Sequence, residues 1–278
     1  TTRRSTMNIF LKKASGLLTA LTVIAVLAAG CSNPAGSDGN GTPGPSSLPA
    51  LPEDVDYVDD DTGAAALLGA MGTDFAAVFD TVEGVIVTAA ISDNWSVTDT
   101  TTIPGMKITG SGSYSEDGPD GMPQKGSKYT FSSNQNVKAE VTAEINEGDT
   151  VFYGGYTTIN MKENGSATIK SINEETQAAT VALDFSYTES YTYALTLSNE
   201  ETDTGGKVIL DATRKGSFKG DVSDVMDLDD IDLSELALIE TYSGFLRVYG
   251  TGDEVVKEVL ITNQATFEEA MAYFSSEP

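Results

Sequence analysis

From about residue 103 onward, apolar and polar residues alternate with a period of two. In residues 128–145 the apolar members share one parity, while Lys, Glu, Asn and Thr fill the other. A longer run keeps its apolar residues on odd positions: Ala179, Val181, Leu183, Phe185, Tyr187, Tyr191, Tyr193, Leu195 and Leu197. Successive side chains of a strand point to opposite faces, so this pattern predicts an antiparallel sheet with one buried face and one solvated face.

Turn-forming residues divide the alternating region into strands. We predict strands near residues 104–116, 127–146, 150–162, 166–174, 178–198, 206–219, 240–250 and 254–262. The run 178–198 would exceed about 60 Å as one strand, so a break is expected near Glu189 or Ser190. A three-residue hairpin loop at 163–165, with Gly165 in the left-handed region, would pair Met161 with Ala167. Further turns are expected at 117–126, 146–149, 199–206 and 250–253.

Helical spacing appears on both sides of the predicted sheet. Apolar residues three and four apart predict a helix over 73–90, capped by Thr73 or Asp74, after a shorter helix over 64–71. The three carboxylates at 59–61 suit a helix start. A C-terminal helix is expected from Thr266, where 266–269 reads as a capping box. The fold class is therefore mainly β: a large curved antiparallel meander sheet or half-open barrel of about 8 to 10 strands, with an N-terminal helix pair and a short C-terminal helix.

The N-terminal region has the three parts of an export signal, in order. Lys12 and Lys13 follow the probable start Met7, an apolar run covers 17–29, and small residues precede Cys31. A helix made of this run would span only about 20 Å, short of the roughly 30 Å hydrocarbon core of a bilayer. The segment is therefore expected to be a cleaved signal peptide rather than a transmembrane anchor.

Residues 27–31, Leu-Ala-Ala-Gly-Cys, resemble the lipobox of bacterial lipoproteins. Ala28 stands where Leu is commonest in that family. The resemblance implies cleavage between Gly30 and Cys31 by signal peptidase II, acylation of Cys31, and anchoring in the bacterial cell envelope. Ser32 favours the outer membrane, at its periplasmic face or the cell surface. The alternative is an ordinary signal peptide followed by a chance Cys.

Composition divides the chain into a signal peptide at 1–30, the acylated Cys with a disordered Gly, Pro and Ser linker at 31–56, and a single β-rich domain at 57–278. Residues 1–30 hold four bases and no acid, so their removal leaves 12 bases and 42 acids, a net charge of −30. A surface so acidic argues against nucleic acid as a partner.

The 278 residues include no His and one Cys, which excludes His-dependent catalysis, Cys and His zinc sites and disulfide frameworks. Nucleophile and nucleotide-binding motifs are absent from the sequence, and no cofactor is expected. A weak calcium candidate is the acidic stretch with Asp227, Asp229, Asp230 and Asp232, but an EF-hand loop starting at Asp227 puts Ile231 at a ligand position. A solvated acidic connection is the favoured interpretation.

Three charged residues fall in the apolar register of the predicted sheet: Glu189, Arg214 and Arg247. If they converge with Tyr187, Tyr191 and Tyr193, they form a charged and aromatic mouth of a small-molecule pocket. The favoured alternative places Glu189 at a turn and each Arg at a sheet edge, with its charge reaching water.

These features predict a lipid-anchored, non-enzymatic envelope protein whose acidic domain is an interaction or binding module. The first alternative is a carrier of a lipid or other hydrophobic ligand, since a helix-flanked curved sheet is similar to the periplasmic lipoprotein-carrier and lipoprotein-receptor family in element order. A carboxylate-dependent hydrolase is a second alternative, although 42 acids single out no catalytic pair. The expected partners are the membrane, reached through the acyl chains, and a hydrophobic small molecule or another envelope protein.

Overall fold

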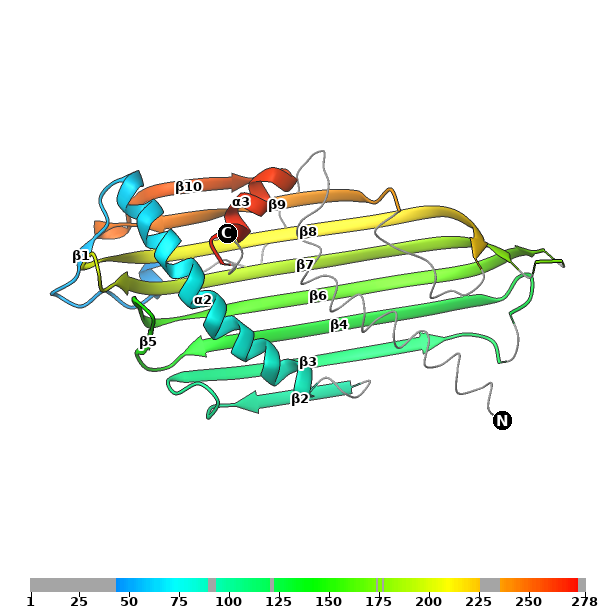
Figure 1. Ribbon diagram of the computed structural model, residues 1–278, viewed down its shortest axis with the longest axis horizontal. Helices are drawn as coiled ribbons and strands as arrows, with labels where there is room; N and C mark the ends of the chain where they lie inside the picture. Colours follow the sequence, from blue (N-terminus) through cyan, green and yellow to red (C-terminus); the bar gives the residue numbers. More distant parts are fainter. Residues whose placement is uncertain are drawn as a thin grey trace.

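The computed structural model describes residues 44–89, 94–120, 123–173, 175–176, 178–225 and 236–274. Its centre is one open sheet in the strand order β10-β9-β8-β7-β6-β4-β3-β2, in which β5 pairs with β6 and β1 pairs in parallel with β8 (Figure 1). The strands are β1 (Asp56–Tyr57), β2 (Asn94–Asp99), β3 (Met106–Asp117), β4 (Lys128–Val141), β5 (Ile145–Glu147), β6 (Thr150–Ile172), β7 (Ala179–Asn199), β8 (Thr204–Val225), β9 (Ile239–Tyr249) and β10 (Val255–Ile261). The predicted mainly β antiparallel meander is confirmed, in its open curved form.

Two of the predicted chain breaks are wrong, because β6 and β7 each run without interruption. Glu189 lies inside β7, in register with Met161 of β6 and Arg214 of β8. Gly165 lies inside β6, where the Phe131 ring of β4 covers the position that a Cβ would occupy. The parity of the apolar residues is preserved across both positions because no turn is present. The 23 residues of β6 and 21 of β7 make strands well beyond the usual 3–10 residues.

The N-terminal helix pair is also wrong, since α2 (Asp61–Ala89) is one helix of 29 residues. Its start agrees with the acidic residues at 59–61: the Asp60 carboxylate accepts a hydrogen bond from Gly63 N at 2.7 Å. Asp74, predicted as a possible cap of a helix over 73–90, lies inside α2. Its carboxylate accepts a hydrogen bond from Asp149 N in the turn between β5 and β6. One buried stripe joins the two halves of the helix: Leu67, Leu68, Met71, Phe75, Val78 and Val82. None of the described helices combines the length and the apolar character needed to cross a bilayer.

The C-terminal helix is present as α3 (Gln264–Ala272), with a capping box formed by Asn263 and Thr266 rather than by residues 266–269. Strand β2 is an element that the sequence analysis missed. Its six residues alternate between exposed and partly buried positions, but the run is too short to stand out beside the following turn.

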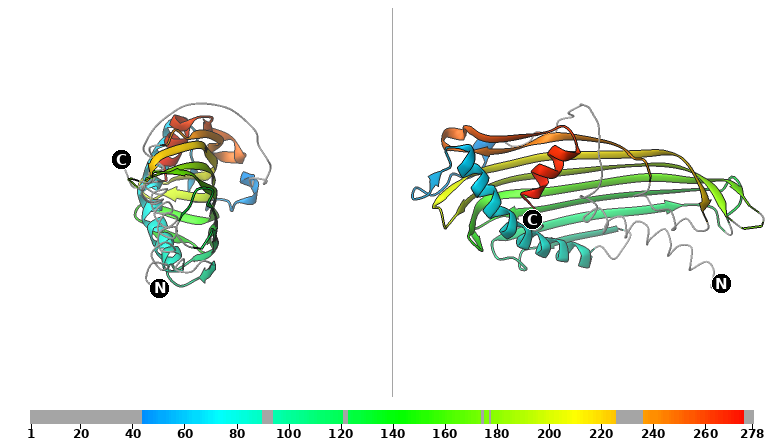
Figure 2. Two further views of the ribbon diagram at one scale, coloured as in Figure 1. Left: turned by 90° about the vertical axis from the view of Figure 1, so that its right-hand side faces the viewer. Right: turned by 45° about the horizontal axis from the view of Figure 1, so that its top comes forward.

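Helices α2 and α3 pack on one face of the sheet, called the inner face (Figure 2). The inner-face residues of β7 that lie beneath them are Tyr191, Tyr193, Leu195 and Leu197. Phe75 of α2 and Phe274, just after α3, contact Tyr193 with ring centroids 5.2 and 4.6 Å apart. This aromatic contact ties both helices to the middle of the sheet.

The opposite, outer face is crossed by residues 44–57, called the strap. Leu48 packs with Ala194, Ile209 and Tyr249, and Thr196 Oγ1 donates to Pro49 O at 2.8 Å. The strap ends in β1, after which Val58 joins the inner core. Residues 44–56 of the predicted linker therefore pack on the folded domain.

Candidate ligand-binding site

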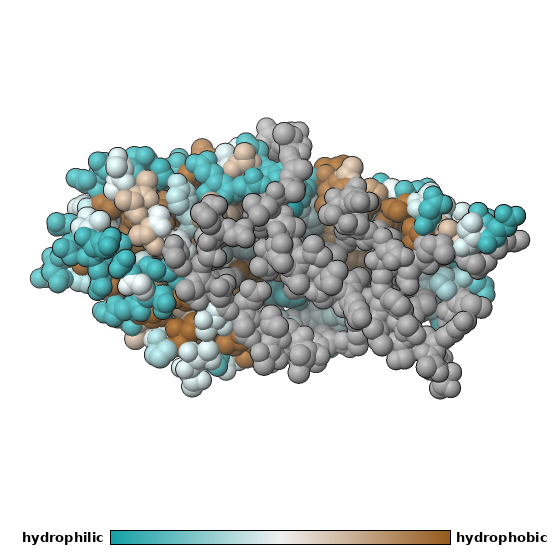
Figure 3. Space-filling view, viewed as in Figure 1, coloured by the Kyte–Doolittle hydropathy of each residue, from teal (hydrophilic) through white to brown (hydrophobic). Residues whose placement is uncertain are grey.

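The candidate site lies on the inner face, beyond the part that α2 and α3 cover. Both helices occupy the left of the view, whereas β4, β6, β7 and β8 extend far to the right (Figure 1). Near the right-hand ends of these strands, Tyr129, Ile169, Val181 and Val225 form a separate buried cluster, the distal cluster. Figure 3 shows hydrophobic residues reaching the surface on this side of the molecule.

Aromatic rings link the distal cluster to the middle of the sheet. Phe131 of β4 stacks on Phe185 of β7 at 6.1 Å between centroids, and Phe185 lies 6.0 Å from Tyr187. At the other end, Phe267 of α3 contacts Tyr191 and Tyr242 at 6.2 and 5.3 Å. The rings thus border a strip of the inner face between the distal cluster and α3.

Charged side chains from four neighbouring strands meet within this strip. Strand register places Glu189 of β7 opposite Arg214 of β8, and Glu163 of β6 opposite Tyr187. Glu240 and Tyr242 come from β9, where they lie opposite Gly216 and Arg214. All of these positions share the inner-face parity of Leu210 and Leu246. We call Glu163, Tyr187, Glu189, Tyr191, Arg214, Glu240 and Tyr242 the polar cluster.

Glu240 is the acid of the polar cluster whose two carboxylate oxygens both accept hydrogen bonds from neighbouring side chains. Its Oε1 accepts from Arg214 Nε at 3.0 Å and Nη2 at 2.6 Å, and from the Tyr187 hydroxyl. Its Oε2 accepts from the Tyr242 hydroxyl at 2.7 Å. Burial raises the pKa of this carboxyl, but the hydrogen bonds from Tyr187, Tyr242 and Arg214 outweigh burial and hold the pKa below its ordinary value. Glu240 is therefore ionised and takes up the charge of Arg214.

Glu189 and Glu163 are buried, but they lack comparable hydrogen bonds among the described residues. Glu189 is 3% exposed and Glu163 7%. Glu189 Oε2 accepts only a long bond of 3.4 Å from the Tyr191 hydroxyl, and its Oε1 has no hydrogen-bond partner among the described residues. Burial raises the pKa of both carboxyls to about 7; Glu189 adds to the rise at Glu163, and Arg214 opposes it at Glu189. The polar cluster thus holds three carboxyls and one guanidinium.

Four of the six residues predicted to line a pocket are brought together: Tyr187, Glu189, Tyr191 and Arg214. Tyr193 instead packs under the helices in the aromatic core. Arg247 lies on the outer face, because its neighbours Leu246 and Val248 point inward. There its guanidinium lies 4.1 Å from the centre of the Phe245 ring, and Nε donates to Glu258 Oε1 at 2.6 Å.

The sequence analysis missed Glu163, Glu240 and Tyr242. Glu163 was assigned to a turn, although it shares the parity of Ile159 and Met161 in an unbroken strand. Glu240 and Tyr242 stand near the start of β9, where the parity of Leu246 and Val248 identifies the inward positions. Continuing the parity through β6 would have found Glu163, whereas β9 carries apolar residues on both parities, so its sequence alone does not select Glu240 and Tyr242.

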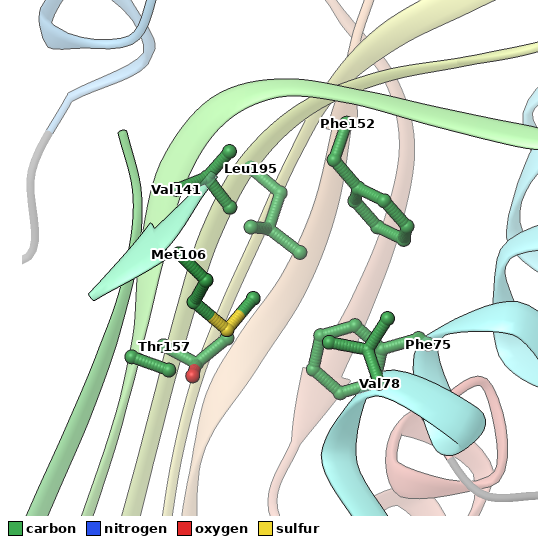
Figure 4. Close-up of a pocket in the computed structure, with 8 residues that line it drawn as sticks. Phe75, Val78, Met106, Val141, Phe152, Thr157 and Leu195 are labelled. Carbon is green, nitrogen blue, oxygen red and sulfur yellow. The ribbon is translucent and has the colours of Figure 1, made fainter. Parts of the chain in front are cut away.

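A small apolar cavity lies elsewhere, beneath α2 (Figure 4). Phe75 and Val78 line it from the helix, and Met106, Phe152 and Leu195 line it from the sheet. Its volume of about 10 Å³ is that of roughly one water molecule, and its lining is almost wholly apolar. This cavity has no room for an acyl chain.

Other predicted site residues lie outside the described part of the chain: Gly30, Cys31, Asp227, Asp229, Asp230 and Asp232. Within the described residues, no group of three or more Asp, Glu or Cys side chains is arranged to hold a metal ion. Comparison with protein-family models, curated proteins and solved structures found no match.

Proposed function

We propose that the chain is an exported lipoprotein of the bacterial cell envelope, held by acyl chains on Cys31, and that its β domain is a non-enzymatic module that binds a hydrophobic molecule. The export signal and the lipobox-like residues 27–31 support the anchor. The domain is strongly acidic and would be repelled from an anionic bilayer surface. An anchored body of this kind is suited to work in the aqueous space beside its membrane.

The observation that carries the binding proposal is the make-up of the inner face beyond α3. Buried rings and aliphatic side chains continue there past the helices, around a few converging polar groups. Ligand sites combine these two elements, an apolar lining and a small number of orienting polar groups. The proposed site is this part of the inner face, and not the cavity under α2.

Uptake of a fluorescent fatty acid or fatty alcohol by the purified full chain tests the binding proposal, together with native mass spectrometry for co-purified lipid. Phe131→Ala removes an inner-face ring and is expected to weaken uptake at least several-fold. Phe245→Ala, a partly buried ring on the outer face, is the matched control and should leave uptake unchanged. A clean ligand-free mass with no uptake of either probe would contradict the proposal.

The anchor is tested separately by Cys31→Ser, which removes the proposed acylation site. The variant is expected to leave the membrane fraction and to lose incorporation of labelled palmitate. Ser32→Ala, one residue further on, should keep both properties. Membrane retention of Cys31→Ser would show that something other than an acyl chain on Cys31 holds the protein.

A further inference from the structure

We propose that the inner-face site selects a ligand with a cationic head, a protonated amine, received by Glu189 and Glu163, while its apolar body lies along Phe131, Phe185 and the distal cluster. This inference rests on the proposed binding function and adds the chemistry of the ligand's polar group. It makes the site specific for amphipathic amines over fatty acids and neutral lipids.

The carboxylate of Glu189 has an unsatisfied oxygen. A buried polar atom without a hydrogen bond is costly, and a buried carboxylate needs donors or a counter-charge. Glu189 is more than nine-tenths buried, and its Oε1 has no partner in the part of the chain that the structure describes. An ammonium group carries three donors and one positive charge, which is what this oxygen lacks.

The charge balance of the polar cluster also favours a cationic ligand. Both hydrogen-bonding nitrogens of Arg214 point to Glu240 Oε1 in an ion pair whose side chains are 13% and 14% exposed. The only guanidinium of the polar cluster is thus already engaged, and Glu163 and Glu189 remain as excess acid. A ligand carboxylate or phosphate would add negative charge beside them, whereas an amine would complete the balance.

The aromatic rings around the polar cluster favour a cationic ligand as well. Tyr187 and Tyr242 already face a cation, since the Arg214 guanidinium carbon lies 5.4 and 6.0 Å from the centres of their rings. Tyr191 borders Glu189 through its hydroxyl. Electron-rich ring faces attract ammonium groups, and carboxylates combined with rings recognise amines. Because burial raises the pKa of Glu163 and Glu189 only to about 7 for each, both carboxyls are partly ionised at neutral pH, and an arriving cation displaces the protons that remain.

The test compares three probes with the same eight-carbon chain: octylamine, octanol and octanoate. Each is titrated into the full chain carrying Cys31→Ser, at near-physiological ionic strength so that the overall negative charge of the protein is screened. Octylamine is expected to bind at least about tenfold more tightly than octanol, and octanoate the most weakly. Glu189→Gln should remove the preference for the amine, so that octylamine then binds no more tightly than octanol.

The matched control is Glu258→Gln, which removes the same charge from the outer face, where Glu258 pairs with Arg247. This control variant should keep the preference for octylamine. If it loses the preference, the effect is a general attraction of amines to an acidic protein and not recognition by Glu189. Equal binding of all three probes, or tighter binding of octanoate, would overturn the amine inference and leave the hydrophobic site standing. Failure of all three probes to bind would overturn both proposals.

Discussion

Two buried carboxyls, Glu163 and Glu189, give the folded protein a defined dependence on pH. Burial raises the pKa of each from 4.5 to about 7, so between these values the folded state binds protons that the unfolded state has released. Their contribution to stability is therefore fully present below about pH 4.5 and is lost as the pH rises through about 7. We expect the melting temperature to fall between about pH 5 and about pH 8, where each kcal/mol is worth roughly 2–4 °C.

Replacing both carboxyls with uncharged amides separates their contribution to stability from the repulsion among the other acidic residues. The groups facing the two carboxyls are Arg214, Glu240 and the hydroxyls of Tyr187, Tyr191 and Tyr242. The double variant Glu163→Gln and Glu189→Gln should show a shallower fall of melting temperature over this range, and Glu258→Gln should keep the original slope. Parallel curves for all three proteins would mean that the two carboxyls ionise normally in the folded state.

At the scale of residues, the sequence identified polar side chains in the buried register but not their partners. Glu189 and Arg214 stand out because a charge interrupts an apolar series. Glu240 cannot be selected in this way, because its role depends on Arg214 and Tyr187 reaching it from two other strands. Arg247 was misplaced because Phe245 and Tyr249 are also apolar: β9 is buried on both faces, so apolar neighbours do not define its inner face.

At the scale of elements, period two predicted most of the strands and the buried face of most of them, but the division into hairpins was wrong at two places. The usual strand length suggested the break at 189–190, and the turn-forming residues Asn164 and Gly165 suggested the one at 163–165, although parity alone gave no reason for either. Long strands are supported here by neighbours of similar length: β6, β7 and β8 pair along 20 or more residues each. Strand length is set by partners distant in sequence, which periodicity does not reveal.

Helix α2 offers a matched pair of glycines three residues apart. Gly69 is exposed, and a Cβ added there meets nothing within 4 Å, so Gly69→Ala should raise stability by about 0.5–1 kcal/mol. Gly72 is buried, and its Cβ would come within 3.3 Å of the Tyr273 carbonyl oxygen at the end of α3. In Gly72→Ala, this crowding should therefore cancel the gain in stability that comes from the higher helix propensity of Ala. Chemical denaturation measures both, and an equal gain at the two positions would show that α3 packs less closely on α2.

At the scale of the whole molecule, the sheet separates the strap from the proposed ligand site. The strap packs on the outer face, where Leu48 and Leu51 are buried. The polar cluster and the distal cluster lie on the inner face. Substitutions in the strap should therefore change stability without changing ligand uptake.

The double variant Leu48→Ala and Leu51→Ala tests this separation in the full chain. Burial of a Leu side chain is worth about 1.5–3 kcal/mol, so loss of both should lower the melting temperature by several degrees. Leu260→Ala, at a position that is 53% exposed, is the control for the same chemical change and should have almost no effect. Uptake of octanol at a temperature where the variant is folded should match that of the parent protein. If the strap variant kept full stability, residues 44–52 would be part of the free linker; if it lost uptake, the two faces of the sheet would be coupled.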